Sequence, residues 1–208
     1  ENTLLSFKKA LDLQVDAIEL DVHLCKTKEV VVIHDNKVDR TTNGTGYVAE
    51  KTFSELRLLD AGKGQKIPAL QEVFDLIKRK ITINIELKGK GTAKPVSEII
   101  EKYVRGKGWQ YDDFLVSSFN RHELLEFSKL KPEIKIGLVT VKASLDLAVK
   151  IKAHSVNVRY DAVNEDFVST AHKKRLMVFA WTVNNSKDIK RIKSYGVDGI
   201  FSDFPDRL

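Results

Sequence analysis

The sequence predicts an α/β fold in which parallel strands curl into a (β/α)8 barrel. Short apolar runs alternate with amphipathic helical segments along most of the 208 residues, and such alternation is typical of a parallel sheet covered by helices. No shift in composition and no low-complexity stretch divides the chain, so we expect residues 1–208 to form a single domain. Two of the apolar runs carry acidic residues near their carboxyl ends, where barrel enzymes build their active sites.

The first predicted elements are a helix and a pair of strands. Residues 1–14 (ENTLLSFKKALDLQ) carry apolar side chains at helical spacing. Residues 15–22 (VDAIELDV) and 30–35 (VVVIHD) are strand-like runs with only residues 23–29 between them. A parallel pair needs a crossover of roughly a dozen residues, so we expect these two strands to form an antiparallel hairpin.

A long polar stretch rich in Gly, Thr and Asn follows the hairpin at about residues 36–68. Connections of this length are usually functional or disordered, and we expect one short helix within it at residues 51–60 (KTFSELRLLD). The next amphipathic helix is predicted at residues 69–80 (ALQEVFDLIKRK). The predicted sheet therefore resumes only after this long connection.

The rest of the chain alternates regularly between strands and helices. The predicted strands are residues 82–88, 114–119, 134–140, 155–160, 177–183 and 198–203. The predicted helices are residues 94–105, 120–130, 143–152, 164–174 and 186–194. This pattern contains seven parallel strands, whereas a closed barrel needs eight. Because the chain opens with a helix, we expect the first barrel strand to precede Glu1; an open doubly wound or seven-stranded sheet is the alternative.

The composition narrows the classes of partner. The net charge of +6 comes from Lys and Arg residues spread over the chain, which suits a solvated surface and would also attract a phosphate-bearing substrate. No stripe of basic and aromatic residues indicates nucleic acid, and no apolar run reaches the ~18 residues of a membrane span. Cys25 is the only cysteine, which excludes an internal disulfide.

We expect a cytoplasmic protein, although a start at Glu1 leaves a secreted form open, and the oligomeric state stays open too.

Acidic and basic side chains share one face of two predicted strands. Glu19 and Asp21 alternate with aliphatic residues in AIELDV, and Glu86 and Lys88 do so in NIELK. Three carboxylates packed together need a compensating charge, and an all-oxygen set suits magnesium or calcium rather than zinc. With one divalent ion and Lys88 the charges nearly cancel, which leaves the site ready for an anion such as a phosphodiester. The alternatives are an exposed acid pair and a surface salt-bridge ladder.

Three further side chains belong to this hypothesis. His34 closes the hairpin over the same end of the sheet, and a histidine is a natural donor of the proton that a departing alkoxide needs. Trp181 lies at the end of a strand, which favours a pocket wall over the core. His23 is in phase with Glu19 and Asp21, so an approach to the metal stays open, but a place in the hairpin is favoured.

These stretches resemble the glycerophosphodiester phosphodiesterase family. The similarity covers essentially the whole chain, and the matching stretches, which are highly specific together, are ENTLLSFKKAL, DAIELDVHLCKTKEVVVIHD, DRTTNGTG, IPALQEVFDLI, NIELK, SSF, WTVNN and GVDGIFSDFPD. It implies a (β/α)8 TIM barrel with a small insertion after the second barrel strand, which matches residues 36–68. It also implies one bound divalent cation and the following roles: Glu19, Asp21 and Glu86 as its ligands, His34 as one of two catalytic histidines, Lys88 as a phosphate contact and Trp181 as part of the substrate pocket.

The resemblance further implies an activity and one departure from the family pattern. The activity is metal-dependent hydrolysis of glycerophosphodiesters to sn-glycerol 3-phosphate and an alcohol. The family's His-Arg-Gly motif precedes the segment matching residues 1–3, so we expect the second catalytic histidine upstream of Glu1; a truncated, inactive chain is the alternative. A lysophospholipase-D-like activity and a phosphodiester-binding barrel without catalysis are rival functions. The head group, the choice of magnesium or calcium, and which histidine is the acid stay open.

Overall fold

The computed structural model describes residues 1–208 and is built on an eight-stranded sheet. The strands are β1 (Ala17–Leu24), β2 (Val30–Val32), β3 (Thr82–Leu87), β4 (Phe114–Ser118), β5 (Lys135–Thr140), β6 (Ser155–Arg159), β7 (Met177–Trp181) and β8 (Gly199–Ile200). Their order in the sheet is β2-β1-β3-β4-β5-β6-β7-β8. β2 is antiparallel to β1, while β1 and β3 to β8 are parallel. The predicted hairpin and the count of seven parallel strands are thus confirmed.

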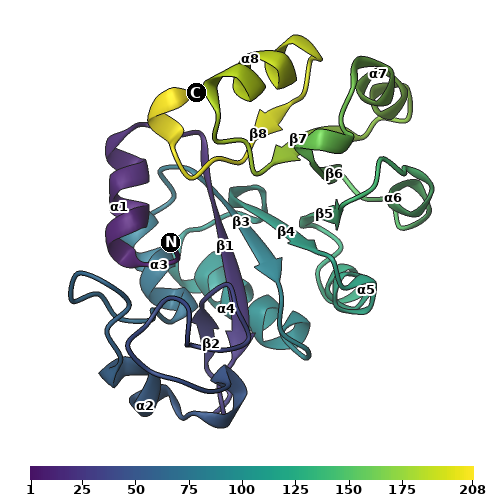
Figure 1. Ribbon diagram of the computed structural model, residues 1–208. Helices are drawn as coiled ribbons and strands as arrows, with labels where there is room; N and C mark the ends of the chain where they lie inside the picture. The colour runs from purple at the N-terminus through teal and green to yellow at the C-terminus, as the bar shows by residue number, and fades with distance from the viewer.

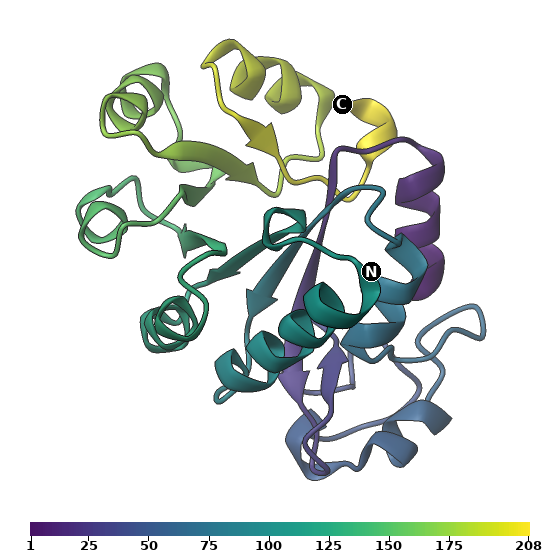
Figure 2. The same ribbon diagram turned by 180° about the vertical axis from the view of Figure 1, so that it is seen from behind.

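The sheet curls into a half-barrel with the helices around its outside (Figures 1 and 2). The α-helices are α1 (Leu4–Asp12), α2 (Phe53–Leu58), α3 (Leu70–Ile77), α4 (Ala93–Lys107), α5 (Arg121–Leu130), α6 (Asp146–Lys150), α7 (Glu165–Lys173) and α8 (Ser186–Ser194). Short 3-10 helices cover Val48–Glu50, Tyr111–Asp113, Tyr160–Ala162 and Pro205–Arg207. No ladder joins β8 to β1, so the sheet is open between them. The eighth parallel strand predicted ahead of Glu1 lies outside the described residues.

The main core lies between the sheet and the surrounding helices. In β1 the aliphatic side chains Leu20 and Val22 are fully buried, and Ile83 and Ile85 of β3 are buried beside them. Burying a side chain of this size stabilises the fold by roughly 1.5–3 kcal/mol. Because successive side chains of a strand point to opposite faces, this apolar packing leaves the polar residues of β1 and β3 on the inner face of the curled sheet.

Asparagine caps start three of the helices that follow parallel strands. Asn120 before α5, Asn164 before α7 and Asn185 before α8 each accept a backbone N–H of the first helical turn through the side-chain oxygen. Replacing such a cap with alanine costs about 1 kcal/mol. These caps hold the loops at the carboxyl end of the sheet, which is the end where the predicted site lies.

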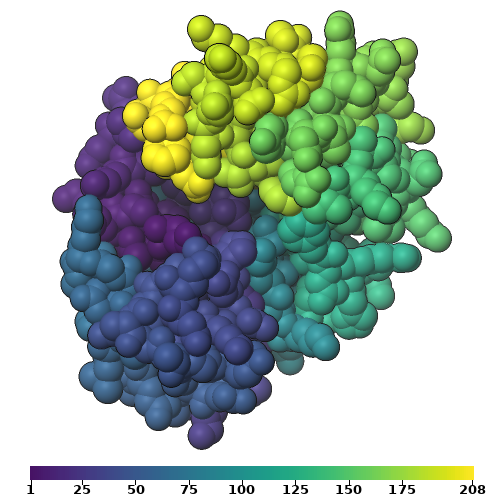
Figure 3. Space-filling view, in the orientation of Figure 1, coloured from purple at the N-terminus to yellow at the C-terminus, as the bar shows by residue number.

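Residues 36–68, where an insertion was predicted, pack together with the hairpin around a second apolar core (Figure 1). This core is separate from the main one and consists of Cys25, Val31, Ile33, Val38, Val48, Leu56 and Ile67. The short helix expected at residues 51–60 is α2, which begins with a capping box between Thr52 and Glu55. The space-filling view is hollowed between this insertion, the N-terminal residues and the C-terminal residues (Figure 3).

Most predicted elements are somewhat shorter in the structure than in the sequence pattern; for example, β2 covers half of residues 30–35 and α3 covers eight of residues 69–80. The helix expected at residues 143–152 is limited to α6, which follows a turn in which Thr140 and Lys142 bond to each other. The last strand was expected to reach Asp203, but its ladder ends earlier, because Asp203 bonds to the side chain of Asn184 instead of to a strand. Separately, none of the helices combines the length and the apolar character needed to cross a bilayer.

Candidate active site

Three acidic side chains meet at the carboxyl ends of β1 and β3. The parallel register places Asp21 beside Glu86, and Glu19 one pleat below on the same face. One carboxylate oxygen from each of the three lies within 4.8 Å of the others. Asp21 and Glu86 are buried and Glu19 is half-buried. The structure therefore brings together the three residues that the sequence predicted as metal ligands.

These carboxylates have too little compensating charge within the protein. Glu19 Oε1 is buried and has no hydrogen-bond partner. Burial, reinforced by the charges of Asp21 and Glu86, raises the pKa of Glu19 well above its ordinary value. Burial also raises the pKa of Glu86, and Lys88 opposes that rise. An unpartnered oxygen within an all-oxygen group of three acids fits a hard divalent cation.

Lys88 lies between the acids and the predicted catalytic histidine. Its Nζ is 3.2 Å from Glu86 Oε1, 3.7 Å from Asp21 Oδ1 and 3.2 Å from His34 Nε2. The side chain is mostly covered, whereas that of His34 is exposed. The ammonium group is thus the one positive charge in direct contact with the acids, and it links them to the imidazole.

His34 is held in one orientation by its neighbour Asp35. Its Nδ1 is 2.6 Å from Asp35 Oδ1. An ammonium group can only donate hydrogen bonds, so the contact with Lys88 assigns a lone pair to His34 Nε2 and the proton to Nδ1, which donates to Asp35. Arg40 bonds both carboxylate oxygens of Asp35, at 2.7 and 3.0 Å, and its hydrogen bonds hold the pKa of Asp35 below its usual range. The imidazole therefore directs an unprotonated nitrogen toward Lys88, which itself contacts the acids.

The first two residues of the chain are also tied to this site, which the sequence analysis did not predict. Arg40 forms two further bonds to Glu1, at 2.6 and 2.9 Å. Asn2 donates from Nδ2 to Asp21 Oδ2 at 2.9 Å and accepts the Asp21 backbone N–H at 3.2 Å. Asn2 has a φ of 51°, which asparagine tolerates better than most residues. Glu1 and Asn2 lie in a stretch that matches the family, which was the one sign in the sequence that they belong to the site. Their contacts with Arg40 and Asp21 depend on the fold and could not be read from the sequence.

Two aromatic residues form a wall next to Lys88. Trp181 is half-buried, and its Nε1 donates to the Asn157 carbonyl at 2.9 Å. Its ring meets the edge of Phe119 with a centroid separation of 5.5 Å, and the Phe119 ring lies 5.7 Å from Lys88 Nζ. Phe119 is 46% exposed. Trp181 was predicted from the sequence as a pocket wall, whereas Phe119 was not, although it ends the matched stretch SSF and directly follows β4 at the same end of the sheet.

His23 does not face the acidic group. Its ring is buried, and Nε2 bonds to the His34 backbone oxygen at 3.1 Å. Burial lowers the pKa of His23, so the ring is neutral and Nε2 donates. A Cβ at Gly89 would lie 3.0 Å from His23 Cα and 3.1 Å from its Nδ1. The open alternative of metal ligation by His23 is therefore not supported, and the ring instead supports the backbone of His34.

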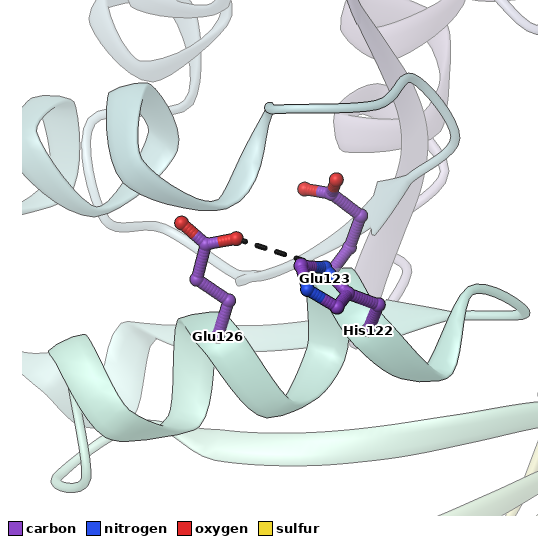
Figure 4. A group of neighbouring side chains, drawn as sticks. All are labelled: His122, Glu123 and Glu126. Carbon is purple, nitrogen blue, oxygen red and sulfur yellow. Dashed lines mark ion pairs between the residues drawn. The ribbon is translucent and has the colours of Figure 1, made fainter.

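A second group of potential ligands lies on helix α5, outside the predicted site. His122, Glu123 and Glu126 also offer atoms within 4.8 Å of one another (Figure 4). His122 and Glu126 face each other at 3.9 Å, and both are at the surface. Glu123 is buried, and both of its oxygens accept backbone N–H groups of the β3–α4 loop and the start of α4. This group differs from the first because its buried carboxylate is already bonded.

Comparison with known proteins places the chain in a family. The profile of the glycerophosphoryl diester phosphodiesterase family matches residues 1–207. A glycerophosphodiester phosphodiesterase of Caldanaerobacter subterraneus is 38% identical over 221 residues, which cover 100% of this chain and 90% of that protein. A glycerophosphodiester phosphodiesterase of Bacillus altitudinis is 38% identical over 227 residues, with the same two coverages.

A solved structure extends this comparison to the fold. The phosphodiesterase of Oleispira antarctica, in complex with the product sn-glycerol-3-phosphate, has a TM-score of 0.91 and 27% identity to this chain. The match covers 100% of this chain and 89% of the Oleispira chain. Sequence and fold agree, and the chain therefore belongs to the glycerophosphoryl diester phosphodiesterase family of phosphoric diester hydrolases.

Proposed function

We propose that this protein hydrolyses glycerophosphodiesters to sn-glycerol 3-phosphate and an alcohol in a reaction that needs a divalent cation. The observation that carries the proposal is the convergence of Glu19, Asp21 and Glu86 next to Lys88 and His34. Membership of the family supports the reaction class. The product bound to the Oleispira relative supports glycerol 3-phosphate as the retained half of the substrate.

Glu19, Asp21 and Glu86 would hold the cation, either magnesium or calcium. When bound there, such an ion polarises a phosphoryl oxygen and offsets the charge that develops on it. The three carboxylates contribute −3, the ion +2 and Lys88 +1, so the group is near neutral before substrate arrives. One phosphodiester anion can then enter without strong repulsion.

Lys88 binds the phosphate in this proposal. Its Nζ stands 3.2 Å from both Glu86 Oε1 and His34 Nε2, at the border between the acids and the open side of the site. A fixed ammonium group at this place stabilises the negative charge on the phosphoryl oxygens as the transition state forms. It also keeps the phosphate within reach of His34.

His34 moves the proton in this proposal, and it does so at Nε2. That nitrogen carries a lone pair in the observed arrangement, because Nδ1–H donates to Asp35. His34 would therefore first take the proton of the attacking hydroxyl, and a second acid would protonate the leaving alcohol. Arg40 keeps Asp35 ionised and in place, which favours the orientation of the imidazole in which Nε2 faces the substrate.

Trp181 and Phe119 would hold the carbon skeleton of the substrate. Their rings meet edge to face beside Lys88, and Phe119 is exposed to an entering ligand. Pockets for small molecules combine such apolar walls with a few polar groups that fix the orientation. A wall of two rings suits the glycerol chain of the product half.

The test is an assay of the full-length protein after removal of metal with a chelator. We expect release of sn-glycerol 3-phosphate from glycerophosphocholine only after magnesium or calcium is added. Lysophosphatidylcholine as a parallel substrate separates this activity from a lysophospholipase-D-like one. Full turnover in excess chelator would contradict the metal role. Metal-dependent binding of glycerophosphocholine without cleavage would instead indicate a binding protein.

A further inference from the structure

Glu123 is a buried carboxylate that the proposed reaction does not use. It lies in the first turn of α5 and is 3% exposed. Oε1 accepts the Gly91 N–H at 2.6 Å, and Oε2 accepts the Ala93 N–H at 3.0 Å. Figure 4 shows the carboxylate directed toward the loop above the helix, whereas His122 and Glu126 face each other. A buried ionised group is costly unless it is well bonded, so these two bonds account for its presence.

The amides bound by Glu123 mark the start of α4. The N-cap residue Thr92 makes no capping bond of its own, because its hydroxyl donates to the Gly89 carbonyl at 2.8 Å. An acceptor must come from elsewhere, and a carboxylate at a helix N-terminus also interacts favourably with the helix dipole. Glu123 therefore caps α4 from the neighbouring helix and frees Thr92 to fold the loop back on Gly89.

The loop held in this way begins directly after Lys88. The Gly89 N–H donates to the Val22 carbonyl at 3.0 Å, which ties the near end of the loop to β1. Glu123 ties the far end, two and four residues further on. The near anchor is also closely packed, since a Cβ at Gly89 would lie only 3.0 Å from His23 Cα. The position of the Lys88 ammonium relative to His34 and Glu86 consequently depends on both anchors.

We propose that Glu123 is a positioning residue for Lys88. By capping α4 across the interface with α5, it fixes the path of residues 89–93 and so holds Lys88 Nζ where the phosphate must bind. This inference rests on the proposed function for the identity of the bound phosphate. A displacement of about 1 Å at a reacting group can cost on the order of 100-fold in rate, so even a partial loosening of this loop is measurable.

The test compares Glu123→Gln with the matched control Glu126→Gln, which makes the same change one turn away at the surface. A glutamine at position 123 keeps the shape but replaces one acceptor with a donor that faces a backbone N–H. We expect Glu123→Gln to weaken the binding of sn-glycerol 3-phosphate, measured by calorimetry in the presence of magnesium, by about tenfold, with a similar loss in kcat/KM. Glu126→Gln should leave both unchanged. Equal values for wild type and Glu123→Gln would overturn the proposal.

A double-mutant cycle separates positioning from a general structural role. If Glu123 acts through Lys88, then Glu123→Gln in a Lys88→Met background should cause little further loss of sn-glycerol 3-phosphate binding. The same tenfold loss in both backgrounds would contradict the proposal. The experiment measures binding of sn-glycerol 3-phosphate, so it does not depend on catalysis. A wild-type protein that binds this ligand but hydrolyses no glycerophosphodiester would contradict the proposed function and leave the role of Glu123 testable.

A second variant covers the case in which Glu123→Gln does not fold. Thr92→Val preserves the shape of a fully buried side chain but removes its hydroxyl, which donates to the Gly89 carbonyl at 2.8 Å and also lies 3.5 Å from Glu123 Oε2. It should weaken sn-glycerol 3-phosphate binding in the same direction, by a smaller factor of roughly threefold. A Thr92→Val protein that folds and binds as tightly as wild type would count against the loop as the link to Lys88.

Discussion

Two groups of potential ligands in this protein, three carboxylates at the ends of β1 and β3 and two carboxylates with a histidine on α5, each bring their atoms within 4.8 Å but differ in what their oxygens bond. At the ends of β1 and β3, Glu19 has a buried oxygen without any partner, and Asp21 and Glu86 share a single ammonium group. On α5, both oxygens of the buried Glu123 accept backbone N–H groups, and its neighbour Glu126 is at the surface. Proximity of acidic residues is therefore a poor guide to a cation site, and unsatisfied oxygens are a better one.

The difference also separates the two physical roles of a buried charge. In the first group the negative charges repel each other in the absence of a cation, so they destabilise the folded state and favour the binding of a cation. In the second group the charge is neutralised by a helix end, so it supports folding and has no capacity left for a ligand. The same change, from carboxylate to amide, should therefore have opposite effects on stability in the two groups.

The largest expected effect is the loss of metal binding on Glu86→Gln. Removing one of three carboxylates should weaken magnesium or calcium affinity by at least about 100-fold, since even residues that only support a ligand are worth 10–100-fold. Calorimetric titration of the metal-free protein measures this. Glu123→Gln should leave metal affinity within about twofold of wild type. Unchanged affinity in Glu86→Gln would remove Glu86 from the ligand set.

Replacing His34 should separate catalysis from metal binding within the first group. His34→Ala removes the imidazole that contacts Lys88, and we expect turnover of glycerophosphocholine to fall by about 10²–10⁴-fold. Because the side chain is exposed, the free energy of unfolding should change by less than about 0.5 kcal/mol. The affinity of His34→Ala for magnesium or calcium should equal that of wild type. A His34→Ala protein with weaker magnesium binding would mean that the imidazole helps to hold the cation.

Local patterns in the sequence were enough to predict the first group of carboxylates. Glu19, Asp21, Glu86 and Lys88 follow from the alternation of side chains along two strands, and a parallel register brings them together without further information. His34 follows from the hairpin, whose short connection allows only an antiparallel return. These inferences needed only residues that are neighbours in the chain or in the sheet.

The rest of the site depends on contacts that no local pattern encodes. Arg40 reaches Glu1 across 39 positions, and Glu123 reaches Gly91 across 32. In the sequence Glu123 resembles any acidic residue in the first turn of an amphipathic helix, and its burial results from the packing of α5 against α4. The end of the last strand was missed for the same reason, since the Asn184 side chain competes for Asp203.

The pH dependence of stability should reveal the raised pKa of Glu19 in the metal-free protein. The pKa of Glu19 is raised in the folded state, so its contribution to stability is fully present below its ordinary value of 4.5 and is lost as pH rises through the raised pKa. The free energy of unfolding of wild type minus that of Glu19→Gln should therefore fall between pH 4.5 and neutral pH. Urea unfolding at several pH values measures the difference.

Added cation provides the control for that pH series. Magnesium or calcium binds the ionised carboxylates of the folded state and should restore stability at neutral pH in wild type, but much less in Glu19→Gln. If the difference between the two proteins rises with pH when metal is absent, then the carboxylate is stabilised by its surroundings and the comparison with Glu123 fails.

The smallest expected effect is that Glu86→Gln and Glu123→Gln change the free energy of unfolding in opposite directions. In the metal-free protein at neutral pH, Glu86→Gln relieves repulsion and should leave the free energy of unfolding equal or higher. Glu123→Gln loses a charged acceptor and leaves a buried N–H facing a donor, which should lower it by about 1–3 kcal/mol. Glu126→Gln, at the surface, should stay within about 0.5 kcal/mol of wild type. A stabilising Glu123→Gln would mean that the buried carboxylate of Glu123 lowers the stability of the fold, as the carboxylates of the first group do. In that case the unsatisfied oxygen of Glu19 would not be the feature that distinguishes a binding site from a helix cap.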